Sequence, residues 1–241
     1  MRLDKLLANS GYGSRKEVKQ LLKKEQVTVD GKVVKDPSMH VDPERQEIHV
    51  FGERLDYKEF IYIMLNKPKG VISATEDLRE RTVIDLLSPL LRHYHPFPVG
   101  RLDKDTVGLL LLTNDGDLAH QLLSPKKHVP KTYYAKIDGK VTEEDVKAFA
   151  RGIVLDDGTM TKPGELKIIK YGDTSEIELT IYEGKFHQVK RMFEAVNKKV
   201  VFLKRLSMAN LVLDPTLKYG EYRELSDEEL KALKEYGSKK E

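Results

Sequence analysis

The apolar residues of this chain fall into short runs bounded by turn residues, and this spacing leaves few architectures open. The longest runs, at 60–65 and 109–112, have the length of a strand. Residues 176–182 alternate strictly between polar and apolar side chains, which is typical of a half-buried strand. Asp157-Gly158 is a hairpin signal. Because hairpin signals outnumber helical patterns, we predict an α+β fold built on a mostly antiparallel sheet.

Residues 1–58 are predicted to form a separate small module of two helices followed by short strands. Ser14 with Glu17 has the spacing of a capping box, which marks the start of the second helix. Asp30-Gly31 predicts a hairpin after it. The charged segment 51–59 is interpreted as a linker. The chain is therefore divided into a module at 1–58 and a larger domain at 59–241.

The larger domain is predicted to carry a mixed, mostly antiparallel sheet with few helices. Strands are expected at 60–65 and 129–137, and the chain is expected to return as a strand at 71–74. Helices are expected at 142–150 and at 187–196, where apolar residues recur at helical spacing.

Composition narrows the class of protein. Hydrophobic residues make up 39% of the 241 residues, which suffices for a real core. The chain has no cysteine, which excludes a disulfide framework and any thiolate metal site. It shows neither a signal peptide nor the run of about 20 apolar residues that spans a bilayer. We expect a soluble cytoplasmic protein with no membrane partner.

The net charge is only +3, but the basic residues are concentrated. Two acidic side chains and seven basic ones occupy the first 24 residues; the basic ones are Arg2, Lys5, Arg15, Lys16, Lys19, Lys23 and Lys24. Further basic stretches run from 126 to 131 and from 185 to 205. Such patches suit a phosphate backbone, although each one alone is also compatible with a solvated surface.

The segment from Val99 to Gly108 has the most unusual composition, because two glycines enclose charged residues that lead into an apolar strand. Taken by itself, it is more simply explained as a capped turn with an Arg101–Asp103 ion pair. A glycosidase-like pair of Asp103 and Asp105 is not established by their spacing. Gly11 and Gly13 form only half of a dinucleotide-binding fingerprint.

Four motifs in this order resemble those of the pseudouridine synthase superfamily. Along the chain they are Leu65 to Gly70, then Gly100-Arg101-Leu102-Asp103 with Thr106 and Gly108, then Lys131-Thr132-Tyr133, and last Glu183 to Phe193. With Thr161-Lys162-Pro163 upstream, the spelling is closest to the branch that modifies small-subunit ribosomal RNA. The N-terminal module resembles a small RNA-binding domain found in a small-subunit ribosomal protein and in tyrosyl-tRNA synthetase.

The resemblance implies a role for particular residues. Asp103 corresponds to the catalytic aspartate, Tyr133 to the tyrosine that stacks on the target uracil, and Lys190 to the basic residue that pairs with the aspartate. Arg101 and Val189 correspond to substrate-binding positions. The superfamily more often has arginine where Lys190 stands, and lysine lacks the bidentate fork of arginine.

The same resemblance implies contact between the N-terminal module and RNA. The residues assigned to this contact are Arg2, Lys5, Arg15, Lys16 and Lys19. No metal and no cofactor are expected, because the reaction of this superfamily, the isomerisation of uridine to pseudouridine, neither loses atoms nor changes an oxidation state.

The expected activity is site-specific isomerisation of a uridine in ribosomal RNA to pseudouridine. Small-subunit RNA within an assembly particle is the first candidate substrate, and the protein is expected to act as a monomer. The alternatives are a large-subunit enzyme and a non-catalytic RNA-binding assembly factor. The intact set of Asp103, Tyr133 and Lys190 argues against the non-catalytic alternative.

Overall fold

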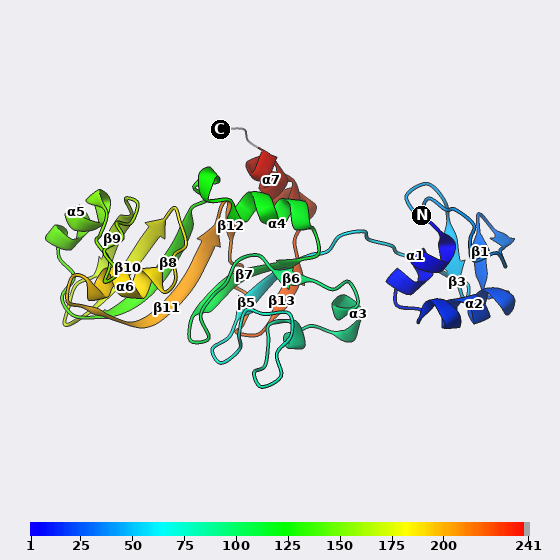
Figure 1. Ribbon diagram of the computed structural model, residues 1–241, viewed down its shortest axis with the longest axis horizontal. Helices are drawn as coiled ribbons and strands as arrows, with labels where there is room; N and C mark the ends of the chain where they lie inside the picture. Colours follow the sequence, from blue (N-terminus) through cyan, green and yellow to red (C-terminus); the bar gives the residue numbers. More distant parts are fainter. Residues whose placement is uncertain (239–241) are drawn as a thin grey trace. The chain divides into compact units, whose positions relative to one another are not determined.

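The computed structural model describes residues 1–238 and separates into two compact units, coloured along the chain in Figure 1. Unit 1 comprises Met1–Ile61 together with Leu87–His95, and unit 2 comprises Tyr62–Leu86 and the chain from Pro96 onward. Among residues 1–238, no helix has the length and apolar character needed to cross a membrane.

Unit 1 contains the two helices and short strands that its sequence predicts. The predicted helices are α1 (Leu3–Asn9) and α2 (Arg15–Lys23), and the segment Leu87–His95 adds the short α3 (Pro89–Arg92), which was not predicted. The strands β1 (Val27–Val29), β2 (Lys32–Val33), β3 (Ile48–Val50) and β4 (Glu53–Arg54) form an antiparallel sheet in the order β2-β1-β3-β4. The capping box is confirmed, because Ser14 and Glu17 bond reciprocally at the start of α2.

The linker interpretation of 51–59 is wrong at its beginning. Phe51 and Gly52 both have positive φ, at 53° and 81°, and turn the chain between β3 and β4. Two positive φ values suit a tight hairpin turn, whose usual sequence is Asn-Gly rather than Phe-Gly. Two of the charged residues that suggested a linker, Glu53 and Arg54, therefore form an exposed edge strand, and only the segment after them leaves the sheet.

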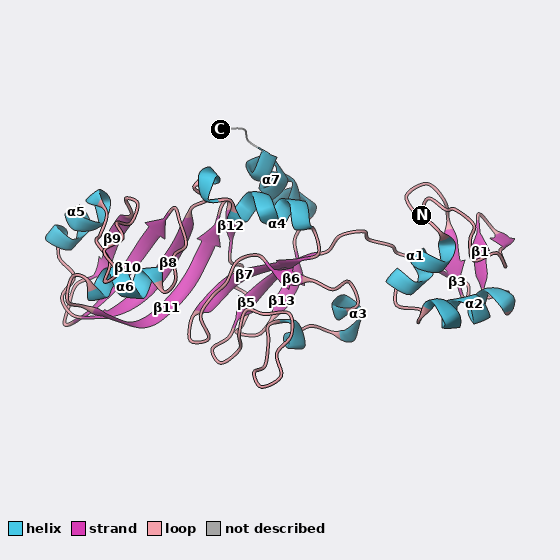
Figure 2. Cartoon of the chain, in the orientation of Figure 1, coloured by secondary structure: helices cyan, strands magenta, loops and turns pink. Residues whose placement is uncertain are grey.

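Unit 2 is built on a nine-stranded sheet in the order β13-β5-β7-β11-β8-β10-β9, with β6 beside β7 and β12 beside β11 (Figure 2). The strands are β5 (Tyr62–Lys67), β6 (Phe97–Pro98), β7 (Val107–Thr113), β8 (Lys131–Asp138), β9 (Glu165–Lys170), β10 (Thr174–Ile181), β11 (Lys199–Met208), β12 (Leu211–Val212) and β13 (Tyr222–Glu224). All pairs are antiparallel except β7 with β11, so the predicted mixed, mostly antiparallel sheet is confirmed.

Four α-helices pack against this sheet. They are α4 (Gly116–Leu123), α5 (Glu143–Arg151), α6 (Gln188–Glu194) and α7 (Asp227–Ser238); short 3-10 turns occupy Ile84–Leu86 and Pro125–Lys127. Helices α4 and α7 lie side by side (Figure 1), and Leu118, Leu122 and Leu233 join one apolar cluster with β5 and β7. Phe149 of α5 contacts Phe193 of α6, and both side chains are fully buried.

The return strand predicted at 71–74 is wrong. Only Ile72 forms a bridge, to Thr82, and the rest of the segment is irregular. After the turn at Gly70 the chain bonds to the loop that holds Asp103. Gly70 N donates to Lys104 O at 2.8 Å, and Ser73 Oγ bonds both Leu102 O (2.9 Å) and Leu102 N (3.0 Å). The apolar residues here therefore support a loop instead of adding to the sheet.

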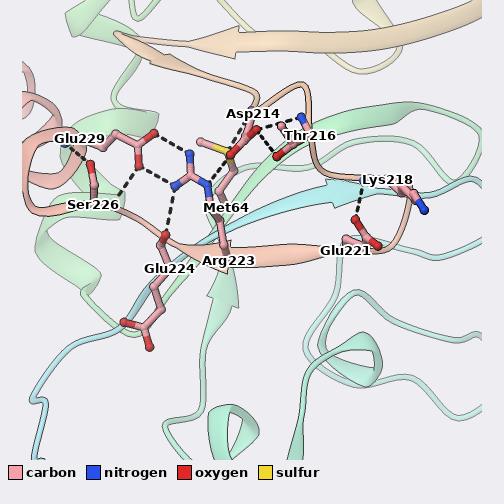
Figure 3. Close-up of polar contacts among 9 residues, drawn as sticks. All are labelled: Met64, Asp214, Thr216, Lys218, Glu221, Arg223, Glu224, Ser226 and Glu229. Carbon is pink, nitrogen blue, oxygen red and sulfur yellow. Dashed lines mark hydrogen bonds and ion pairs between the residues drawn. The ribbon is translucent and has the colours of Figure 1, made fainter.

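Arg223 on the edge strand β13 ties three segments together (Figure 3). Its guanidinium donates to Asp214 at 2.7 Å and to both carboxylate oxygens of Glu229, in α7, at 2.7 and 2.9 Å. Glu229 also accepts from Ser226 N at 2.9 Å, which caps the helix. The Thr216 hydroxyl and Arg223 together lower the pKa of Asp214 to about 2.

Arg223→Met is expected to destabilise unit 2 at neutral pH, and the difference from wild type should shrink in acid. The lowered pKa of Asp214 means that its contribution is present above about pH 4 and is lost as the pH falls toward 2. Urea unfolding at pH 7 and pH 3 measures this. Arg79→Met is the control, because Arg79 is exposed and has no ion pair in the described chain. An unchanged midpoint at pH 7 would contradict the prediction.

Candidate active site

A cavity of about 820 Å³ opens in unit 2, between the loop that precedes β7 and the face of the sheet formed by β8 and β11. Asp103, Tyr133, Val189, Lys190 and Arg101 all line it. The structure thus brings together every residue that the sequence assigned to catalysis or substrate binding. Its volume lies within the range of ordinary small-molecule pockets, about 300–1,000 Å³.

The floor of the cavity is part of the sheet. Lys131 and Tyr133 are two residues apart on β8, so their side chains share one face. Arg205 on β11 is the direct partner of Tyr133 in the register, which places these two side chains next to each other. All three residues line the cavity, and Tyr133 is 7% exposed. The floor is therefore a tyrosine ring flanked by cations.

Asp103 lies in the loop before β7, and its side chain is 29% exposed. Lys190 Nζ is 3.0 Å from Asp103 Oδ2, and His187 Nε2 is 3.4 Å from Asp103 Oδ1. The Arg101–Asp103 ion pair that the isolated motif suggested does not form. Arg101 is exposed and makes no ion pair within residues 1–238. The cation that pairs with Asp103 is Lys190, from the adjacent helix α6.

Lys190 also contacts a second carboxylate, since its Nζ donates to Asp105 Oδ1 at 2.7 Å. Burial acts to lower the pKa of Lys190, but hydrogen bonds to Asp105 and Asp103 outweigh this and raise it. For Asp105, burial acts to raise the pKa, and the bond to Lys190 leaves it lowered. The lysine is therefore held in its charged form between two carboxylates.

Gly108 determines how closely β7 approaches β11. Its φ is +102°, and a Cβ atom at this position would lie 2.3 Å from Arg205 O. Both the backbone conformation and the available space therefore require glycine. This close parallel pairing places the loop of Asp103 beside the strand that carries Arg205.

Sequence reasoning assigned no role to Lys67, although it lies within a recognised motif. Lys67 ends β5 and is fully buried. Its Nζ donates to the carbonyl oxygens of Thr106 (2.8 Å), Asp103 (3.0 Å) and Pro68 (3.1 Å). Burial lowers the pKa of Lys67 to about 8, while the charges of Asp105 and Asp103 oppose this shift. Lys67 thus supports the loop of Asp103 through these hydrogen bonds, and a lysine that ends an otherwise apolar strand was the signal in the sequence.

Lys67→Met is expected to destabilise unit 2 by about 1–3 kcal/mol, because several carbonyl oxygens lose their donor. Urea unfolding measures the loss. Amide hydrogen exchange should also quicken in the loop around Asp103. Lys69→Met, at an exposed position of the same turn, is the control. Equal stability and equal exchange rates in the two variants would rule out this role.

The α6 side of the cavity combines an apolar wall with an exposed aromatic. Val189 is 4% exposed, and Phe186 is 74% exposed. The Phe186 ring stacks on the His187 ring with centroids 3.8 Å apart. His187 has a left-handed backbone conformation, φ 49°, and caps α6, so this helix begins at Gln188, one residue later than predicted.

In unit 1, the residues assigned to RNA contact are mostly free to meet a ligand. Lys5, Arg15, Lys16 and Lys19 are exposed on α1 and α2. Arg2 is exposed too, but its guanidinium pairs with the buried Asp4 at 2.9 Å. The other basic stretches are less exposed than their composition suggests, since Arg205 is 1% exposed and Arg191 pairs with Asp156 and Asp157.

Comparison with known proteins agrees with this geometry. An RNA pseudouridylate synthase family model matches residues 61–195, and an S4 domain model matches residues 1–46. The chain is 59% identical to the uncharacterised RNA pseudouridine synthase YtzG of Bacillus subtilis, over 98% of this chain and 99% of the relative. It is 42% identical to ribosomal large subunit pseudouridine synthase B of the same organism, over 97% and 95%.

It is also 37% identical to ribosomal small subunit pseudouridine synthase A of Escherichia coli, over 97% of this chain and 100% of the relative. A solved pseudouridylate synthase structure superimposes with a TM-score of 0.68 at 37% identity, over 97% of this chain and 99% of that one. The chain belongs to the RNA pseudouridylate synthase family and carries an S4 domain at its N-terminus.

Proposed function

We propose that this protein isomerises a uridine of ribosomal RNA to pseudouridine, with Asp103 as the catalytic carboxylate. The observation that carries the proposal is the 3.0 Å pair of Asp103 and Lys190 at a cavity that Tyr133 also lines. A carboxylate balanced by a cation, next to an aromatic ring, is what this reaction requires of an enzyme.

The reaction breaks the bond between ribose C1′ and uracil N1, turns the base, and joins C5 to C1′. The target nucleotide must first leave its stack, at a cost of about a few kcal/mol. The cavity of about 820 Å³ is large enough for an extruded nucleotide. The reaction is an isomerisation in which no atoms are gained or lost, and we propose that side chains lining the cavity carry it out.

Each side chain has a proposed part in this reaction. Asp103 attacks C1′, takes a proton from C2′, or stabilises positive charge on the sugar, and each of these needs the ionised carboxylate. Lys190 balances that charge. The ring of Tyr133 stacks on uracil, Val189 supplies an apolar wall, and the exposed guanidinium of Arg101 binds the nucleotide's phosphate.

The S4 domain is proposed to hold the RNA through the exposed cations of its helices. Arg15 and Lys19 are four residues apart on α2, so they share one exposed face. Each phosphate they neutralise releases counterions, which makes the affinity depend on salt.

Small-subunit ribosomal RNA is the first candidate substrate, because the spelling of the motifs is closest to that branch. Large-subunit RNA is the second candidate, and it is favoured by the 42% identity to a large-subunit enzyme against 37–40% for the small-subunit relatives. We further propose that the protein acts as a cytoplasmic monomer and prefers a partly assembled small subunit to naked RNA.

Transcripts of each ribosomal RNA, labelled with tritium at uracil C5, test this function, because forming the new C5–C1′ bond releases the tritium. Release from the small-subunit transcript or particle alone is expected. Release from the large-subunit transcript alone selects the second candidate. A protein that binds both RNAs and releases no tritium from either is an assembly factor, and the proposal fails. Mapping pseudouridines in cells with and without the gene then identifies the nucleotide.

A further inference from the structure

Two cations on the cavity floor have no anionic partner. Arg205 is 1% exposed; its Nε donates to Leu109 O at 2.8 Å, and its buried Nη2 has no hydrogen-bond partner in the described part of the chain. The only hydrogen bond of Lys131 Nζ within residues 1–238 is to Val129 O, at 3.2 Å. Neither residue belongs to an ion pair there. Both side chains line the cavity.

The acidic group whose charge acts on Lys131, Glu183, does not neutralise this pair. Glu183 is engaged by Lys185 Nζ at 3.2 Å, by the backbone N of Lys162 at 2.8 Å and by Gln188 Nε2 at 3.0 Å. Burial and, to a smaller extent, the charge of Arg205 lower the pKa of Lys131 to about 8, and the charge of Glu183 opposes this only in part. A buried donor without a hydrogen-bond partner carries an uncompensated desolvation cost. A ligand bearing negative oxygen would remove that cost.

We propose that Lys131 and Arg205 bind the carbonyl oxygens of the target uracil and stabilise the negative charge that the base acquires when it leaves the ribose. This inference rests on the proposed function and assigns the leaving-group half of the reaction. The strand register supports it, because Lys131 and Arg205 flank Tyr133, the residue proposed to stack on the base. The cations therefore lie beside the base, whereas the Asp103–Lys190 pair lies on the loop and helix across the cavity.

The reaction places negative charge on the departing base, and cations beside the base stabilise that charge. When the C1′–N1 bond breaks, its electron pair stays on N1 and spreads onto O2 and O4. Asp103 compensates by bonding to C1′ or by taking the C2′ proton. After the base turns, C5 bonds to C1′, and Asp103 is released or returns the proton to C2′. The C5 proton then passes to solvent, and N1 takes a proton from solvent. Preorganised cations facing a developing oxyanion commonly contribute about 10²–10³-fold to the rate.

Lys131→Met tests the inference, with Lys136→Met as the matched control, because Lys136 is exposed on the same strand. Single-turnover tritium release is measured with enzyme saturating, and RNA affinity is measured by filter binding. We expect Lys131→Met to lower the saturated rate about 100-fold without changing affinity, and Lys131→Arg to recover much of it. Arg205→Lys should likewise lower the saturated rate without changing affinity. Thermal unfolding verifies that each variant is folded.

The same cations would also suit a phosphate of the RNA backbone, and the measurements separate the two ligands. A loss of affinity with an unchanged saturated rate identifies a phosphate contact and overturns the inference. So does a Lys131→Met rate equal to that of Lys136→Met. If wild-type protein releases no tritium from any ribosomal RNA, the proposed function fails and this inference fails with it. If wild type is active and Lys131→Met is unimpaired, only the inference fails.

Discussion

Replacing Asp103 with asparagine is expected to lower pseudouridine formation by about 10⁴-fold or more while RNA affinity stays near that of wild type. An amide has nearly the same shape as a carboxylate, but it is a poor nucleophile and a poor proton acceptor. The position is also close to Lys190, at 3.0 Å, and to His187, at 3.4 Å, so the variant keeps its polar neighbours. RNA affinity should persist because the exposed cations supply most of it.

Asp105→Asn is the matched control for this experiment. It lies two residues away in the same loop, bonds the same lysine at 2.7 Å, and has a side chain that is 57% exposed. We expect it to retain much of the single-turnover rate, since its carboxylate is not proposed to touch the sugar. If purified Asp103→Asn keeps substantial activity, or if Asp105→Asn loses as much, Asp103 is not the catalytic carboxylate.

Lys190→Met is expected to lower the rate about 100-fold at neutral pH and to shift the acidic limb of the pH–rate profile to higher pH. Lys190 bonds both Asp103 and Asp105 and lowers the pKa of Asp105. Without it, two carboxylates face each other with less compensation, and like-charge repulsion disfavours ionising both. Activity should therefore recover partly as the pH is raised. Lys190→Arg keeps the cation and should remain much more active.

The measurement is the single-turnover rate against pH for wild type and both variants, with enzyme in saturating excess over RNA so that a lost phosphate contact does not affect the rate. Arg191→Met is the control, because Arg191 is the adjacent cation on α6 and pairs instead with Asp156 and Asp157. Its pH profile should match that of wild type. If Lys190→Met changes only RNA affinity, Lys190 is a contact to the RNA backbone rather than the cation that balances Asp103.

Local patterns in the sequence determined the elements whose stabilising contacts are close along the chain. The capping boxes at Ser14 and at Thr142 predict the starts of α2 and α5, since each joins residues three positions apart. The alternation at 176–182 predicts β10, which has one face buried. The order of the four motifs indicated the family, and the site residues they marked do line one cavity.

The family resemblance had indicated that Lys190 pairs with Asp103, but tertiary structure alone decided the other contacts of these residues. Lys190 also bonds Asp105, and Lys67 supports the loop from the end of β5. In the sequence Arg205 is one of several cations in a basic stretch. The pairing of β11 with β8 places it beside Tyr133, where it is buried in the floor of the cavity.

The physical reason lies in the range of each interaction. A helix cap or an alternating strand depends on neighbours a few residues away, and the sequence displays these directly. Which face a strand residue points to, and which charge it meets, depends on the register between strands distant in the chain, such as the parallel pair of β7 and β11. That register is set by the packing of the whole sheet, and the buried cations of the active site follow from it.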